Sequence, residues 1–102
     1  KESGLPYDFR IKFLNEDEGT MFDDNECKNV KFIEVKSTTK ESKEAFPISY
    51  QELCFAQKFS DQFEIYRLYN AAHADSNQVS IRIIKNIPSL LNSHGISLFI
   101  VI

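Results

Sequence analysis

The stretch of sequence that decides the fold is VKFIEVKS, residues 30–37. It is rich in valine, isoleucine and phenylalanine, which favour strands, and its side chains follow a period of two. The pattern predicts a β-strand in which Glu34 and Lys36 project from the same face. A carboxylate and an ammonium group are therefore expected side by side on one face of a sheet.

Four further strands are predicted around this one, and they are expected at residues 7–13, 63–69, 78–84 and 96–102. The first alternates so that Tyr7 and Phe9 share one face and Asp8 lies on the other. Residues 63–69 are apolar on both faces, which is typical of an interior strand. Between the first two strands, residues 15–27 hold six acidic residues and no basic one, which indicates a loop.

Two helical segments are also predicted. Ser49 and Glu52 form an S-x-x-E capping box, so a helix is expected from Ser49 to about Phe59. The NIP stretch at residues 86–88 predicts a short helical turn that closes near Gly95. The order of the elements predicts an α/β or α+β domain, in which a mixed sheet carries at least one packed helix in two to three layers.

Composition is that of a single globular domain: 102 residues, 42% hydrophobic, with a formal net charge of −3. This weakly acidic balance argues against a basic coat over the whole surface. The most apolar run, residues 96–102, is too short to span a bilayer, and no signal peptide opens the chain. We expect an intracellular protein, nuclear or cytoplasmic, with no membrane partner. Because the chain begins without methionine and stops inside an apolar run, we also expect residues 1–102 to be one domain of a larger protein.

The pairing of Glu34 with Lys36 suits hydrolysis of phosphodiester bonds. The carboxylate can hold a hard cation such as Mg²⁺, and the lysine can neutralise charge on a phosphoryl group. Asp8, on the preceding strand, is the natural second carboxylate. The Glu-x-Lys pattern occurs three times in the chain, so an ordinary ion pair on a solvated sheet face is the alternative interpretation.

Several blocks of the sequence resemble a known family. They are residues 4–9 (GLPYDF), 33–38 (IEVKST), 46–49 (FPIS), 52–56 (ELCFA), 85–91 (KNIPSLL) and 96–98 (ISL). Together they are similar to the C-terminal domain of the plant NO VEIN protein, which also occurs in bacterial proteins linked to helicases and restriction systems. That family is regarded as part of the PD-(D/E)xK, or restriction-endonuclease-like, group. The resemblance implies a mixed central sheet flanked by helices, with metal at the ends of two adjacent strands.

The resemblance also implies roles for individual residues. Asp8 matches the first metal-binding acid, Glu34 the second and Lys36 the catalytic lysine. The carbonyl of Val35 occupies the position of a further metal ligand, and the metal would be Mg²⁺ or Mn²⁺. Glu52 matches a glutamate in the family's helix, although the capping box also explains this residue.

Two functions stay open at this point. The first is a metal-dependent nuclease, a hydrolase that binds and cuts DNA or RNA. The second is a catalytically inactive module of the same fold that docks to proteins or nucleic acid within a multidomain parent. The family's enzymes usually carry an acidic helix before the first strand, and we expect this helix to be missing here or to lie in the parent protein.

The distribution of charge favours a nucleic-acid partner near the predicted site. Without residues 15–27, the remaining 89 residues carry 12 positive against nine negative charges. Residues 28–43 alone hold five lysines against Glu34 and Glu41. An acidic total therefore hides a locally basic region, and weak, salt-sensitive binding is expected there.

Overall fold

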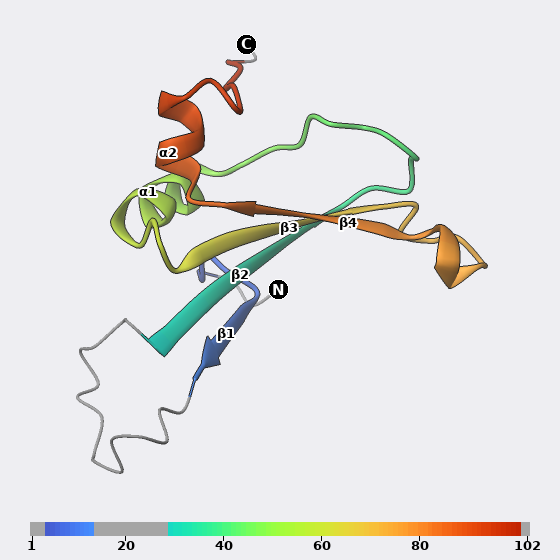
Figure 1. Cartoon of the computed structure of the whole chain (residues 1–102), viewed down its shortest axis with the longest axis horizontal. Helices are drawn as coiled ribbons and strands as arrows, with labels where there is room; N and C mark the ends of the chain where they lie inside the picture. Colours follow the sequence, from blue (N-terminus) through green and yellow to red (C-terminus); the bar gives the residue numbers. More distant parts are fainter. Residues whose placement is uncertain (1–3, 14–28, 101–102) are drawn as a thin grey trace.

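The computed structural model describes residues 4–13 and 29–100. Within these ranges the chain forms a four-stranded mixed sheet with two α-helices, so the predicted α+β fold is confirmed. The strands are β1 (Phe9–Lys12), β2 (Val30–Ser37), β3 (Phe63–Tyr69) and β4 (Ser80–Lys85), the helices are α1 (Tyr50–Lys58) and α2 (Ile87–Asn92), and a 3-10 turn, η2 (Ser76–Gln78), precedes β4 (Figure 1).

The sheet places its strands in the order β1-β2-β3-β4. β2 and β3 are parallel, whereas β1 and β4 are antiparallel to their neighbours. A parallel pair needs a crossover connection, and α1 lies on the connection from β2 to β3. Figure 1 shows α1 and α2 together at one end of the sheet. β2 and β3 are thus the central strands, as the apolar sequence of residues 63–69 predicts.

One face of the sheet packs against both helices. Its buried cluster consists of Val30, Phe32, Ala56, Phe63, Ile65 and Ile87. The rings of Phe32, Phe55, Phe59 and Phe63 extend this cluster, with centroid separations from 4.7 to 5.7 Å. Such aromatic pairs each contribute about 0.5–1.5 kcal/mol beyond the burial of apolar area. The packing fixes α1 against β2, and this contact positions the candidate site.

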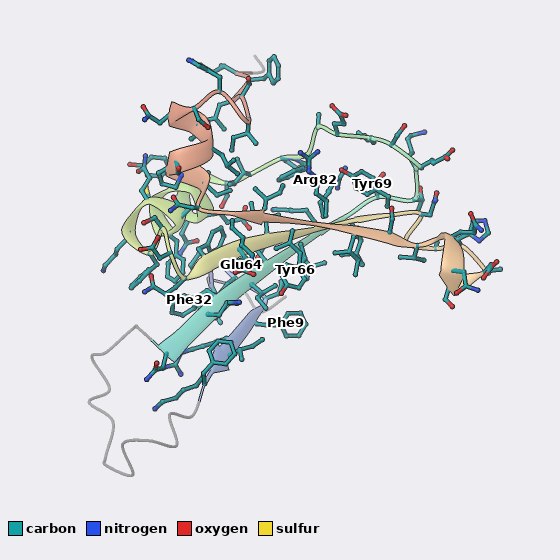
Figure 2. The ribbon with its side chains drawn as sticks, in the orientation of Figure 1. Phe9, Phe32, Glu64, Tyr66, Tyr69 and Arg82 are labelled. Atoms are coloured by element: carbon teal, nitrogen blue, oxygen red, sulfur yellow. The ribbon has the colours of Figure 1, made fainter. Side chains whose placement is uncertain are left out.

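The other face of the sheet carries neither α-helix. The register places Phe9, Ile33 and Glu64 side by side on this face, together with Ile83 on β4. Ile33 is buried, but Phe9 and Ile83 are 58% and 48% exposed. Figure 2 shows the ring of Phe9 projecting away from the ribbon of β1. Lys31 forms an ion pair of 3.2 Å with Glu64 across the same face. The apolar side of β1 is therefore not part of the core in the described chain.

The first strand differs from its prediction in length and in the orientation of one residue. β1 begins at Phe9, and the Tyr7 ring contacts the rings of Phe32 and Phe55 at 4.9 and 5.5 Å. Tyr7 thus packs in the core on the helix-covered face, whereas Phe9 is exposed. The prediction that Tyr7 and Phe9 share a face is wrong. The regular strand starts only at Phe9, so Tyr7 does not follow its alternation, and the Tyr7 ring packs with the aromatic rings of the core.

The predicted last strand is also wrong over its described part, since residues 96–100 form no strand. After α2, the amides of Gly95 and Ile96 donate to the Leu90 carbonyl at 2.8 and 3.4 Å. These bonds close the helix in a turn, and the apolar run that follows pairs with no sheet edge. Phe99 is accordingly 85% exposed. Residues 101 and 102 lie outside the described ranges, as does the predicted acidic loop at residues 15–27.

The remaining boundaries agree closely with prediction. β2 spans the predicted residues 30–37, and β4 begins at Ser80 because η2 occupies the residues before it. α2 follows Asn86, whose side chain accepts a hydrogen bond from the Ser89 amide at 3.2 Å. In the described parts of the chain, no helix has the length and apolar character needed to cross a membrane.

Candidate active site

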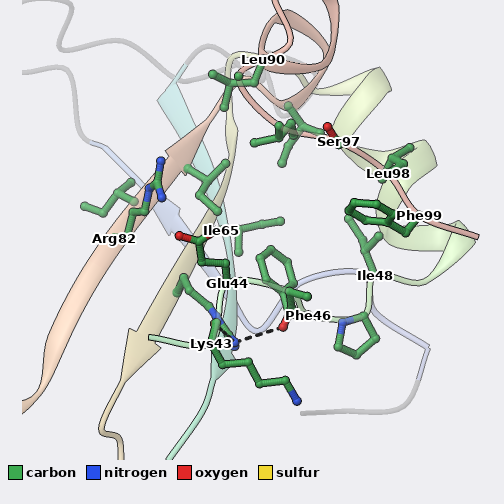
Figure 3. A pocket seen from close by; sticks show the side chains of 18 of the residues that line it. Lys43, Glu44, Phe46, Ile48, Ile65, Arg82, Leu90, Ser97, Leu98 and Phe99 are labelled. Carbon is green, nitrogen blue, oxygen red and sulfur yellow. Dashed lines mark hydrogen bonds between the residues drawn. The ribbon is translucent and has the colours of Figure 1, made fainter. Parts of the chain in front are cut away.

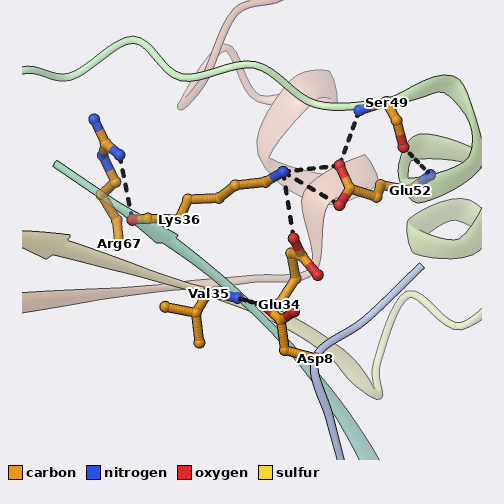
Figure 4. Close-up of polar contacts among 7 residues, drawn as sticks. All are labelled: Asp8, Glu34, Val35, Lys36, Ser49, Glu52 and Arg67. Carbon is orange, nitrogen blue, oxygen red and sulfur yellow. Dashed lines mark hydrogen bonds and ion pairs between the residues drawn. The ribbon is translucent and has the colours of Figure 1, made fainter. Parts of the chain in front are cut away.

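A lysine on β2 connects two buried carboxylates. Lys36 Nζ lies 3.3 Å from Glu34 Oε2, and 2.9 and 3.2 Å from the two carboxylate oxygens of Glu52 on α1 (Figure 4). The side chains of both glutamates are only 3% exposed, and that of Lys36 is 17% exposed. Burial of charge is tolerated where the geometry is close and oppositely charged groups meet. The predicted neighbours Glu34 and Lys36 thus form part of a buried cluster, not a solvated pair.

The local sequence of α1 explains why Glu52 reaches this position. Ser49 has extended backbone angles, with φ −77° and ψ 158°, and its hydroxyl accepts a hydrogen bond from the Glu52 amide at 3.0 Å. In return, Glu52 Oε1 accepts a hydrogen bond from the Ser49 amide at 2.9 Å. The predicted capping box is therefore confirmed. The same carboxylate oxygen also contacts Lys36, so one side chain caps the helix and holds the lysine.

Asp8 lies at the start of β1, where it is fixed to the backbone of β2. Its amide donates to the Ile33 carbonyl at 2.8 Å, and its Oδ2 accepts a hydrogen bond from the Val35 amide at 2.7 Å. The side chain thereby extends the antiparallel ladder beyond the end of the strand. Figure 4 shows the Asp8 carboxylate beside β2, next to the point where Glu34 leaves the strand. Asp8 forms no ion pair with any described residue.

The predicted site residues are thus brought together at one end of β2. Lys36, Glu34 and Glu52 are in direct contact, and Asp8 contacts Val35 through the backbone. Residues 4–13 and 29–100 contain no cluster of three or more histidine, cysteine, aspartate or glutamate side chains arranged to hold a metal ion. A metal at this site would therefore rest on two carboxylates and backbone oxygen.

Comparison with family models gives one match. The model described as Protein NO VEIN, C-terminal, matches residues 1–84. The chain belongs to this family. The matched range contains Asp8, Glu34, Lys36 and Glu52, and it ends before α2. Comparisons with curated proteins and with solved structures find no match to the chain.

In this NO VEIN C-terminal domain, three basic side chains form a row across the helix-covered face. The register pairs Lys36 on β2 with Arg67 on β3, and Arg67 with Arg82 on β4. Paired residues of neighbouring strands project from the same face of a sheet. Arg67 is 2% exposed and Arg82 is exposed, so the row runs from the buried cluster towards the solvent. Neither Arg67 nor Arg82 is among the site residues that the sequence predicts.

The guanidinium of Arg67 is held by carbonyl groups and aromatic rings. It donates hydrogen bonds to the carbonyls of Lys36, Lys43 and Ala45, at 3.2, 2.7 and 3.3 Å. The rings of Phe46 and Tyr69 lie 5.1 and 5.5 Å from its central carbon, within the range of cation–π contacts. Arg67 therefore fastens the loop after β2 to the sheet. The alternation of the strand shows which face Arg67 is on, but not that the loop at residues 43–46 covers it.

The histidines and the described cysteine lie outside this cluster. His73 is exposed in the turn after β3, where its Nδ1 accepts a hydrogen bond from the Asp75 amide at 3.0 Å. His94 is exposed after α2. Cys54 is half-buried on α1, and its hydrogen bond with the Tyr50 hydroxyl raises the pKa of that tyrosine. None of these three residues belongs to the buried cluster.

Proposed function

We propose that this domain is a nuclease-like module of the PD-(D/E)xK, restriction-endonuclease-like, type, which binds nucleic acid and hydrolyses a phosphodiester bond with Mg²⁺ or Mn²⁺. The observation that carries the proposal is the placement of Asp8. Its carboxylate is fixed by the Val35 amide beside the Glu34–Lys36 pair, and its charge is not in an ion pair with any described residue. An acid held in this way is ready to take a cation.

The donor set fits a hard divalent cation, because carboxylate and carbonyl oxygens are the ligands that Mg²⁺ prefers. Asp8 and Glu34 would supply the carboxylates. The Val35 amide faces β1, and the amide and carbonyl of a strand residue point to the same edge, so the Val35 carbonyl would supply a third oxygen. When bound, the cation would neutralise charge on the phosphoryl group and make an attacking water more acidic.

Lys36 would stabilise negative charge that develops on the phosphate during hydrolysis. Glu52 holds its ammonium through both carboxylate oxygens, which fixes the lysine without a need for reorganisation. Arg67 and Arg82 continue the positive charge along the sheet from Lys36. A phosphate backbone that crosses the strands in this direction would meet the exposed Arg82, while the buried Arg67 would act only through its charge. Because the surplus of positive charge is small, binding should be weak, should fall with salt and should benefit from the rest of the parent protein.

Cleavage of labelled nucleic acid tests the enzymatic form of the proposal. Duplex DNA, single-stranded DNA and RNA are incubated with the domain and Mg²⁺ or Mn²⁺. We expect Lys36→Met to lower the cleavage rate by about 100-fold or more, as loss of one positioned donor does elsewhere. Asp8→Asn should lower it as well, while it keeps an acceptor for the Val35 amide.

Glu41→Gln and Lys40→Met are the matched controls, because both residues are exposed in the loop after β2. They carry the same change of charge as the test variants but lie outside the buried cluster. Circular dichroism establishes that each variant is folded before its rate is compared. Absence of cleavage by the unmodified domain, or equal rates in test and control variants, would contradict hydrolysis at this site.

An inactive docking module is the second candidate, and one observation favours it. Lys36 lies between two buried carboxylates, which is also a stable structural arrangement without a metal. Calorimetric titration with Mn²⁺ separates the two functions. Binding heat that disappears in Asp8→Asn supports the metal site, whereas nucleic-acid binding without any Mn²⁺ binding supports the docking module.

A further inference from the structure

The helix-covered face also contains an open cavity of about 1160 Å³. It lies between the loop at residues 43–48, strands β3 and β4, and the segment at residues 94–99. Figure 3 shows Arg82 on one side of the cavity and Ile48 and Phe99 on the other. Asp8, Glu34, Lys36 and Glu52 do not line it. The cavity therefore shares none of these four side chains, although Arg67 and Arg82 in its walls also belong to the basic row beside the candidate active site.

The walls of this cavity combine a large apolar area with a concentration of positive charge. The apolar part includes Ile48, Ile65, Leu90, Leu98 and Phe99. The charged part consists of Lys43, Arg67 and Arg82, against the single acid Glu44. Lys85 also borders the cavity, but its pairing with Glu64 places its side chain on the opposite face of the sheet. Apolar cavities with a few converging polar groups are the usual sites of small molecules, and the polar groups select the ligand. Here those groups are mainly cationic.

Arg67 gives this cavity an unbalanced charge. It is 2% exposed, forms no ion pair with any described carboxylate, and its Nε is buried without a hydrogen-bond acceptor. Burial of a charge is costly unless an opposite charge is close. Arg82 lies directly opposite Arg67 in the β3–β4 pair, and like charges at such positions destabilise a sheet. An anion between the two guanidinium groups would relieve both effects.

We propose that this cavity binds a small amphipathic anion. Its carboxylate or phosphate group contacts Arg82, which is exposed and can donate hydrogen bonds directly. Arg67 attracts the anion through its charge and does not contact it, because Arg67 is 2% exposed and its Nε is buried. The apolar body of the ligand packs against Ile48, Leu90 and Phe99. This chemistry is shared by medium-chain carboxylates and by nucleoside monophosphates, and the inference does not depend on nuclease activity.

Calorimetric titration of the domain tests the proposal with two matched pairs of probes. Octanoate is compared with 1-octanol, and adenosine monophosphate with adenosine, so each pair differs in the anionic group. We expect at least one anion to bind about tenfold or more tightly than its neutral counterpart, as one charge-assisted hydrogen bond provides. The pair that shows the difference identifies the source of the anion as an aliphatic acid or a nucleotide.

Arg82→Gln should abolish this preference for the anion, and the variant should fold because Arg82 is exposed. Arg10→Gln is the matched control, because Arg10 is exposed on β1 and does not line the cavity. Glu44→Gln should tighten binding of the anion several-fold, since it removes the one acid from the walls. Equal affinity for anions and neutral probes, or an equal loss in Arg82→Gln and Arg10→Gln, would overturn the proposal.

Discussion

Replacement of Lys36 by methionine measures how strongly the buried cluster depends on its cation. Methionine keeps much of the apolar stem and removes the ammonium that lies 3.3 Å from Glu34 and 2.9 Å from Glu52. Removal of one partner from a buried pair typically costs about 3–5 kcal/mol. Lys36 retains 17% exposure, which lets water screen the cluster, so we expect a loss near the lower limit, about 3 kcal/mol.

Unfolding in urea, followed by circular dichroism and tyrosine fluorescence, gives this free energy, because the chain contains four tyrosines and no tryptophan. Small domains have urea slopes of about 1–3 kcal/mol per molar, so the midpoint should fall by roughly 1–3 M. Lys40→Met is the matched control in the exposed loop, and it should change stability by less than about 0.5 kcal/mol.

A double variant, Glu34→Gln with Lys36→Met, sharpens the same test. It removes one buried carboxylate together with the cation, so its loss should be smaller than that of Lys36→Met alone. Exposed ion pairs are worth about 0–1 kcal/mol, and a solvated pair would therefore show only a small effect in each variant. If Lys36→Met shifts the urea midpoint no more than Lys40→Met does, the buried cluster does not exist in solution and the argument for this site is refuted.

Two further predictions concern neighbouring hydrogen bonds and use the same urea titration. Ser49→Ala removes the hydroxyl that accepts the Glu52 amide and should cost about 1 kcal/mol, and a loss below the error of the titration would show that the cap is not formed. Asp8→Ala leaves the Val35 amide without its carboxylate acceptor and should cost about 1–3 kcal/mol, whereas Asp8→Asn retains an acceptor and should cost less. Equal losses in the two Asp8 variants would exclude this hydrogen bond as a source of stability.

The sequence carried strong signals for some elements and weak ones for others. The period of two defines β2 with its observed bounds, and the capping box defines the start of α1, because both signals are local. The pairing of Arg67 with Arg82 depends on the β3–β4 register. Residues 70–79 connect these strands, and a connection of this length does not fix a register as a tight turn does. The burial of Arg67 likewise could not be predicted, because the carbonyls of Lys36, Lys43 and Ala45 that surround it are distant in the sequence.

Glu52 shows why structural and functional interpretations of a residue need not compete. The sequence left two explanations for it, as a member of the capping box and as part of the site. Its Oε1 in fact contacts both the Ser49 amide and Lys36 Nζ, each at 2.9 Å. A substitution of Glu52 would therefore weaken the helix and release the lysine together. Ser49→Ala removes the hydroxyl of the cap but leaves the contact of Glu52 with Lys36 in place. We therefore expect the rate of the proposed cleavage, corrected for the folded fraction, to be unchanged in Ser49→Ala, and a slower corrected rate would show that the cap also acts on the site.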